Sequence, residues 1–165
     1  MSHILFVVAL CFAALVLALA FAALPQLFIK VKPSRRLAVL GSVVGIISVI
    51  SYIGIAALPA DIHLPTHKLF VYIAFTAFLL VVALYSAAIL RHKYYPNIYA
   101  YTYLAFAVIL ALYLVLLFAG PKADTVWGNR LQAIGQKIVV YAEIVCMFIQ
   151  SYGALRLQRR LSSQE

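Results

Sequence analysis

The stretch LFVYIAFTAFLLVVALYSAAIL, residues 69–90, carries no charged side chain and is long enough to cross a lipid bilayer. About 20 apolar residues in an α-helix cover the hydrocarbon core. Backbone N–H and C=O groups have no water to bind there, so a helix must satisfy them internally. The stretch also lacks the alternation of apolar and polar residues that marks a barrel strand. It therefore predicts a transmembrane helix.

Four similar runs flank this stretch, and together they predict an all-α bundle of five transmembrane helices. The expected helices cover residues 4–29, 37–60, 69–90, 98–120 and 138–157. The chain is 67% hydrophobic and 10% charged, with a mean hydropathy of +1.07. A soluble domain of this size could not bury so much apolar surface. We expect one membrane domain, residues 1–165, in which Pro25 kinks or frays the end of the first helix.

Basic residues are distributed unequally among the segments that connect the predicted helices. Most lie in the first connection, the third connection and the C-terminal tail, namely Lys30, Lys32, Arg35, Arg36, Arg91, Lys93, Arg156, Arg159 and Arg160. Because connections rich in Lys and Arg stay in the cytoplasm, the N-terminus is predicted outside and the C-terminus inside. The net charge of +9 is thus explained by topology and by contact with anionic lipid, not by nucleic-acid binding. The expected location is the bacterial cytoplasmic membrane.

The second predicted helix carries a stripe of small residues, Gly41, Gly45 and Ser48, that continues to Tyr52. Successive members are three or four positions apart and therefore share one helix face. Small side chains let helices approach closely in lipid, where packing replaces the hydrophobic effect. The stripe predicts close packing within the chain, or docking of a partner subunit or a second copy of the chain.

The last predicted helix places three polar residues, Gln136, Glu143 and Gln150, seven positions apart on one face. Such residues normally face the protein interior or a hydrated cavity, because exposure to lipid costs several kcal/mol. If the helix begins at residue 138, Glu143 lies roughly 7 to 9 Å below the outer boundary. An ion pair with Lys68 or Arg130 would satisfy it, and so would a hydrogen bond between a protonated carboxyl and a Tyr or Gln.

The segment DIHLPTHK, residues 61–68, places Asp61, His63 and His67 between the second and third helices. These residue types bind Zn²⁺ and similar ions, so a metal ion at this outer loop is one hypothesis. Proton or headgroup chemistry and ordinary loop polarity are the alternatives. Pro65 suits the first turn of the third helix, which would leave His63 in the loop and His67 near the membrane surface. No other cofactor is expected.

Two fragments, ALPADIHLPTHKLFVYIAF at 57–75 and GNRLQAIGQKIVVYAEIV at 128–145, carry a family resemblance. Over about residues 57–157 the chain resembles the DRAM/Frag1/Sfk1-like polytopic membrane proteins and their uncharacterised bacterial relatives. Those proteins generally have six membrane helices, whereas five are predicted here. The resemblance implies a connection with lipids, carried by Asp61, His67 and Gln136.

Three classes of function follow from these features. The favoured one is a small non-catalytic integral membrane protein, either an accessory subunit of a membrane complex or a lipid-binding protein. The residues then expected to contact lipid or a partner are Gly41, Gly45, Tyr52, Gln136, Glu143 and Gln150. The second is a membrane enzyme that acts on a lipid headgroup, with Asp61, His63 and His67 as ligands or acid/base groups and Glu143 in support. The third is a transporter or channel element in which Glu143 and Gln150 line a path.

Overall fold

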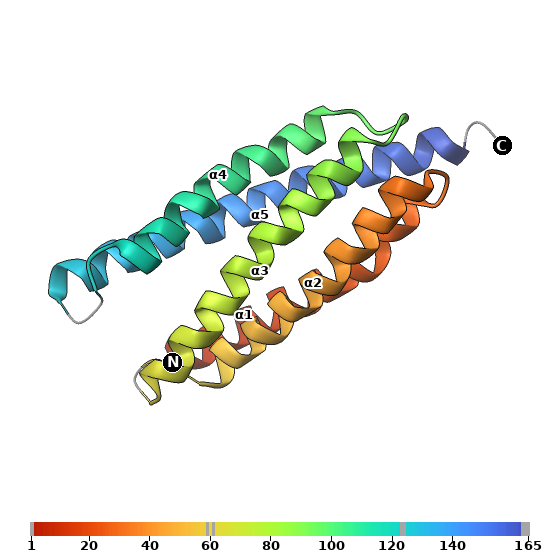
Figure 1. Cartoon of the computed structure of the whole chain (residues 1–165). Coiled ribbons are helices and arrows are strands. Elements are labelled where there is room, and N and C mark those ends of the chain that lie inside the picture. The colour runs from red at the N-terminus through yellow and green to blue at the C-terminus, as the bar shows by residue number, and fades with distance from the viewer. Residues whose placement is uncertain (1, 59, 61, 123–124, 163–165) are drawn as a thin grey trace.

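The computed structural model describes residues 2–58, 60, 62–122 and 125–162, and every regular element in them is helical (Figure 1). The elements are α1 (Ser2–Ala23), the 3₁₀-helix η1 (Leu24–Phe28), α2 (Lys32–Ala57), α3 (Leu64–Leu90), α4 (Ile98–Ala119) and α5 (Val126–Ser162). Five spans are long and apolar enough to cross a membrane, and η1 completes the first of them. The predicted all-α fold of five transmembrane helices is confirmed, and the chain has the architecture of an integral membrane protein.

Proline residues mark three of the helix boundaries. The α-helical geometry of α1 changes to 3₁₀ at Pro25, and α2 and α3 each carry a proline in the first turn. Proline fits there because its missing N–H would have had no partner in the helix. The predicted place of Pro65 in the third helix is therefore confirmed. The starts predicted at 37 and 69 were too late, because the polar first turns lower the local hydropathy.

The largest correction concerns α5, which begins at Val126 and not at residue 138. Its 37 residues correspond to about 55 Å, so it extends well beyond a hydrocarbon core of about 30 Å. The hydroxyl of Thr125 accepts a hydrogen bond from the Gly128 N–H at 3.0 Å and caps the helix start. Arg130 and Lys137 are consequently exposed on a helix, where a connection was expected. Hydropathy had detected where the strongly apolar part of this helix begins, not where the helix itself begins.

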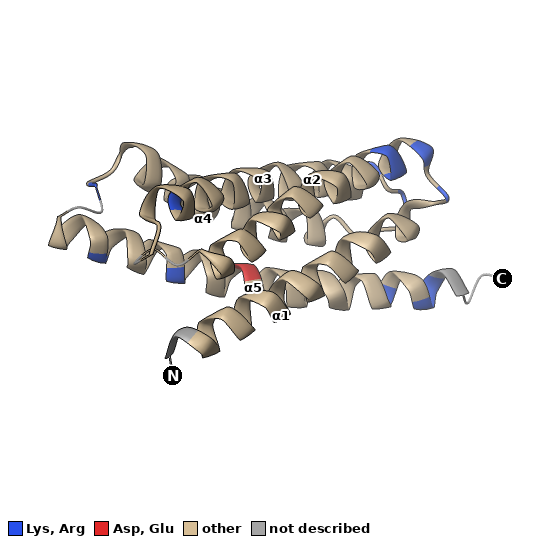
Figure 2. Cartoon of the chain, turned by 90° about the horizontal axis from the view of Figure 1, so that it is seen from below, with Lys and Arg blue, Asp and Glu red and all other residues tan. Residues whose placement is uncertain are grey.

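The helices pack in chain order, each on its predecessor, and α5 also contacts η1 (Figure 1). We call the end with the α2–α3 and α4–α5 connections the His67 end. The opposite end, with the η1–α2 and α3–α4 connections, is the His92 end. Most Lys and Arg residues lie at the His92 end (Figure 2). The predicted orientation places this end in the cytoplasm.

The small-residue stripe of α2 packs inside the chain. A Cβ atom added to Gly45 would lie 2.6 Å from the Phe21 ring of α1, and one added to Gly41 would lie 3.1 Å from Tyr85 of α3. The Ser48 hydroxyl donates a hydrogen bond to a backbone carbonyl of α3 at 3.0 Å. Contacts with α1 and α3 therefore occupy this face.

The α3–α4 connection contains a buried histidine, His92, which is 3% exposed. Its ring packs edge-on against Phe28 and Tyr95, with centroid distances of 5.4 and 6.3 Å. Neither ring nitrogen has a hydrogen-bond partner among the described residues. Burial lowers the pKa of His92 from its ordinary value of 6.5, because the charged imidazolium loses its hydration.

This environment predicts a loss of stability in acid. Below about pH 6.5 the unfolded chain binds a proton at His92 more readily than the folded chain, so the free energy of unfolding decreases. We expect His92→Phe to raise the melting temperature at about pH 5 and to leave it nearly unchanged at about pH 8. Thermal unfolding in detergent across this range measures the effect, with the exposed His63→Gln as control. Equal acid sensitivity of wild type and His92→Phe would contradict the prediction.

Candidate functional site

The polar residues of α5 face the interior of the bundle at three successive depths. Gln136 lines a pocket at the His67 end, Glu143 is 8% exposed near the middle of α5, and Gln150 is 2% exposed beside a pocket at the His92 end. One helix face therefore links both pockets. The seven-residue spacing is what keeps these side chains on that face.

Glu143 is joined to α2 by a hydrogen bond from the Tyr52 hydroxyl to its Oε2 atom at 2.9 Å. Tyr52 lies about 7 to 8 Å from the end of α2. The depth predicted for Glu143 assumed a helix that begins at residue 138, whereas α5 begins at Val126. The tyrosine partner is thus one of the two arrangements anticipated. Lys68 instead lines the His67-end pocket, and Arg130 is exposed. The pair connects α2 and α5, which are not among the extensively packed helix pairs.

Gln150 joins α5 to α4. Its Nε2 atom donates to the Tyr99 carbonyl at 2.8 Å, and because a carbonyl only accepts, this contact fixes which amide atom is nitrogen. The Oε1 atom has no hydrogen-bond partner among the described residues. Gln150 therefore holds two helices together at the inner edge of the His92-end pocket.

The His67-end pocket has a volume of about 600 Å³ and lies between α3, the end of α4 and α5. Its polar lining residues are His67, Lys68, Lys122, Asn129, Gln132 and Gln136. The structure thus brings His67 and Gln136, two of the predicted site residues, to one cavity. Sequence reasoning did not assign Lys122, Asn129 and Gln132 to a site, because the segment before residue 138 was predicted to be a connection and only Gln136 shares the seven-residue spacing with Glu143 and Gln150.

The two histidines of the α2–α3 segment have different partners. The His67 Nδ1 atom lies 2.8 Å from the Leu58 carbonyl, whereas the His63 Nδ1 atom lies 2.8 Å from the Thr66 hydroxyl. His63 is exposed and does not line the pocket. Asp61 lies outside the described residues. Within the described part of the chain no three His, Cys, Asp or Glu side chains converge as metal ligands, so the metal hypothesis gains no support.

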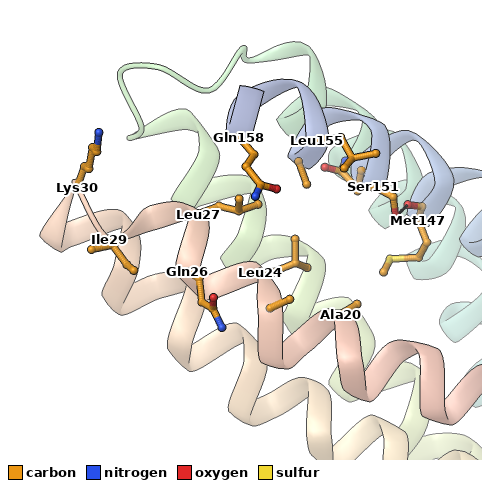
Figure 3. A pocket seen from close by; sticks show the side chains of 13 residues that line it. Ala20, Leu24, Gln26, Leu27, Ile29, Lys30, Met147, Ser151, Leu155 and Gln158 are labelled. Atoms are coloured by element: carbon orange, nitrogen blue, oxygen red, sulfur yellow. Dashed lines mark hydrogen bonds between the residues drawn. The ribbon is translucent and has the colours of Figure 1, made fainter. Parts of the chain in front are cut away.

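The His92-end pocket has a volume of about 710 Å³ and separates η1 and the end of α1 from α5 (Figure 3). Ala20 and Met147 line it toward the middle of the bundle, and Lys30 and Gln158 line it toward the His92 end (Figure 3). Ser151 and Gln158 are seven positions apart, but they lie one position beyond the series Gln136, Glu143 and Gln150, whose next member is the buried Leu157. The polar face that the sequence predicts therefore did not identify this pocket.

No known protein family, curated protein or solved structure matches this chain. The resemblance to the DRAM/Frag1/Sfk1-like proteins therefore stays a prediction from the two fragments at 57–75 and 128–145.

Proposed function

We propose that this integral membrane protein is a non-catalytic lipid-binding protein that holds part of a phospholipid in the His92-end pocket. The observation that carries the proposal is the division of the pocket walls. Leu24, Leu27 and Met147 are apolar, whereas Lys30 and Gln158 are polar and lie nearer the bundle end. An acyl chain matches the first group and a headgroup the second. The volume of about 710 Å³ lies within the range of about 300 to 1,000 Å³ common for ligand pockets.

Access from the bilayer supports the same proposal. Helix α1 packs on α2 and η1, but α1 and α5 are not among the extensively packed pairs. The groove between them can therefore admit a lipid from the side. Because η1 contacts α5 at the His92 end, the pocket is bounded there by protein. A lipid that enters would exchange contact with neighbouring lipids for contact with two protein walls.

The charge at this end favours an anionic headgroup. A second groove, on α2, has Lys32, Arg35 and Arg36 next to apolar side chains of the same helix. In the predicted orientation these residues face the cytoplasm of a bacterial cell, where basic residues attract the anionic lipids of the inner leaflet. The lipid expected in the His92-end pocket is therefore an anionic phospholipid.

The other hypotheses receive less support from the geometry. An accessory subunit was expected to dock through Gly41 and Gly45, but both glycines pack inside the chain. An enzyme was expected to combine Asp61, His63 and His67; Asp61 lies outside the described residues, and the two histidines have separate partners. A transport path was expected to follow the polar face, but Glu143 lines neither of the two pockets at its ends.

A substitution that fills the pocket tests the proposal. Ala154 is half-buried in the pocket wall, and Ala154→Phe would occupy the space assigned to the acyl chain. We expect the affinity for the lipid to fall about tenfold, which corresponds to a loss of about 1.4 kcal/mol in binding free energy and lowers the fraction of molecules that carry a lipid. Native mass spectrometry of the full chain, extracted in mild detergent, measures this fraction.

Two further variants make the result interpretable. Ala105→Phe adds the same side chain to an exposed position on α4 and should leave lipid binding unchanged. Leu155→Trp, at an exposed position that also lines the pocket, should reduce it. The proposal fails if the wild-type protein carries no lipid. It also fails if all three variants carry as much lipid as the wild-type protein.

A further inference from the structure

The His67-end pocket has a different chemical character from the lipid pocket. Lys68 enters its lining from the second turn of α3, and Lys122 enters from the α4–α5 connection. Three amide side chains of α5 complete the polar wall: Asn129, Gln132 and Gln136. No Asp or Glu from the described part of the chain lines this cavity. Its charged groups among these residues are therefore cationic.

The backbone at Lys122 is held in place by its neighbours. The N–H and hydroxyl of Thr125 donate to the Lys122 carbonyl at 3.3 and 3.2 Å. The Gln132 Nε2 atom donates to the Pro121 carbonyl at 2.8 Å and ties the connection to α5. These contacts position the base of the lysine side chain at the rim of the pocket.

His67 is oriented by a backbone contact on the other side of the pocket. Because the Leu58 carbonyl can only accept, the His67 Nδ1 atom carries the hydrogen in their 2.8 Å contact. In that tautomer the second ring nitrogen, Nε2, carries no hydrogen and can only accept a hydrogen bond. On the bundle side the pocket is closed by aromatic side chains. Tyr72 of α3 stacks on Phe118 of α4 with a centroid distance of 5.0 Å.

We propose that the His67-end pocket binds an anionic phosphate group, with Lys68 and Lys122 providing its counter-charges. Lysine is a common phosphate ligand, acting as a point charge. The amides of α5 add hydrogen-bond donors around the same space, which suits a group with several acceptor oxygens. The phosphate can belong to a lipid headgroup at this end or to a soluble molecule. The site does not depend on lipid binding at the His92 end.

The test uses the full chain in nanodiscs of phosphatidylcholine. In one arm, equilibrium dialysis with radiolabelled inorganic phosphate measures binding from solution. In the other, the nanodiscs contain phosphatidylglycerol, and native mass spectrometry counts the lipids that remain bound. We expect saturable binding in at least one arm, weakened at least tenfold in the double variant Lys68→Gln/Lys122→Gln. Salt should weaken it as well, because both lysines are near solvent.

A charge-matched control distinguishes this site from general attraction to a basic protein. Lys137 is exposed on α5 beside Gln136 but does not line the pocket, so Lys137→Gln should bind like wild type. Saturation only in the dialysis arm identifies a soluble phosphate, and saturation only in the lipid arm identifies a headgroup. The absence of saturation in both arms overturns the proposal. Equal loss of binding in Lys137→Gln overturns it too.

Two acidic residues close to this pocket in sequence, Asp61 and Asp124, lie outside the described residues. Substituting them tests independently whether the bound ligand is an anion. If the site binds an anion, Asp61→Asn and Asp124→Asn should bind phosphate as tightly as wild type or more tightly. Weaker phosphate binding in either variant would show that the ligand is organised by a carboxylate, and would overturn the assignment.

Discussion

Gly45→Val lowers the free energy of unfolding by about 1 to 3 kcal/mol, the usual cost of overpacking a core. The first added carbon would lie 2.6 Å from the Phe21 ring, far inside van der Waals contact. Phe21 is 2% exposed and packs near Phe78 and Tyr85, with centroid distances of 6.3 and 6.5 Å. The ring cannot move away without displacing these neighbours, so α1 must separate from α2.

The measurement is unfolding of the purified protein in detergent, by heat or by denaturant. Ala13→Val is the matched control, because it adds side-chain volume at an exposed position of α1. Its melting temperature should remain close to that of wild type. If Gly45→Val were no less stable than Ala13→Val, the close contact between α1 and α2 would not exist as described.

Glu143→Leu is expected to destabilise the bundle by about 1 to 3 kcal/mol, because it leaves a buried hydroxyl without a partner. Tyr52 is 5% exposed, and Glu143 is its hydrogen-bond acceptor at 2.9 Å. No water is present in the hydrocarbon core to replace a lost partner. Leucine has a similar size, so the main change is the loss of the acceptor.

A double-mutant cycle with Tyr52→Phe isolates the hydrogen bond from other effects of each substitution. Once Glu143 is leucine, removal of the Tyr52 hydroxyl should cost nothing or restore stability. We expect a coupling energy of about 0.6 to 1.7 kcal/mol, the range found for hydrogen bonds between membrane helices. Gln136→Leu, on the same face of α5, should be additive with Tyr52→Phe. Additivity in the Glu143 cycle would contradict the contact.

Most of the fold was predictable from the sequence because a bilayer imposes one rule on every span. Any run as long and apolar as residues 69–90 must be helical there, and its neighbours follow the same rule. Helix ends were less predictable. The true start of α5 depends on a hydrogen-bonded cap at Thr125. Hydropathy detects only where the strongly apolar turns of the helix begin.

The candidate site was only partly predictable. The spacing of Gln136, Glu143 and Gln150 correctly indicated an interior face, because helical periodicity is a local property. The partner of Glu143 is 91 residues away along the chain, and no local rule selects Tyr52 among the polar residues at that depth. The two pockets depend on how α5 lies against α1, α3 and α4. That arrangement is set by packing among distant segments.

The hydrogen bond between Tyr52 and Glu143 also bears on the order in which the protein is assembled. Helices α2, α3 and α4 each pack on the preceding α-helix, so α1 to α4 can associate as the ribosome delivers them to the membrane. The Tyr52 hydroxyl lacks its Glu143 acceptor until α5, which is made after α1 to α4, has been inserted. The hydrogen bond between α2 and α5 therefore forms only after α1 to α4 are in place. A chain truncated before residue 143 should insert four helices, remain open beside α2, and be degraded faster by membrane proteases.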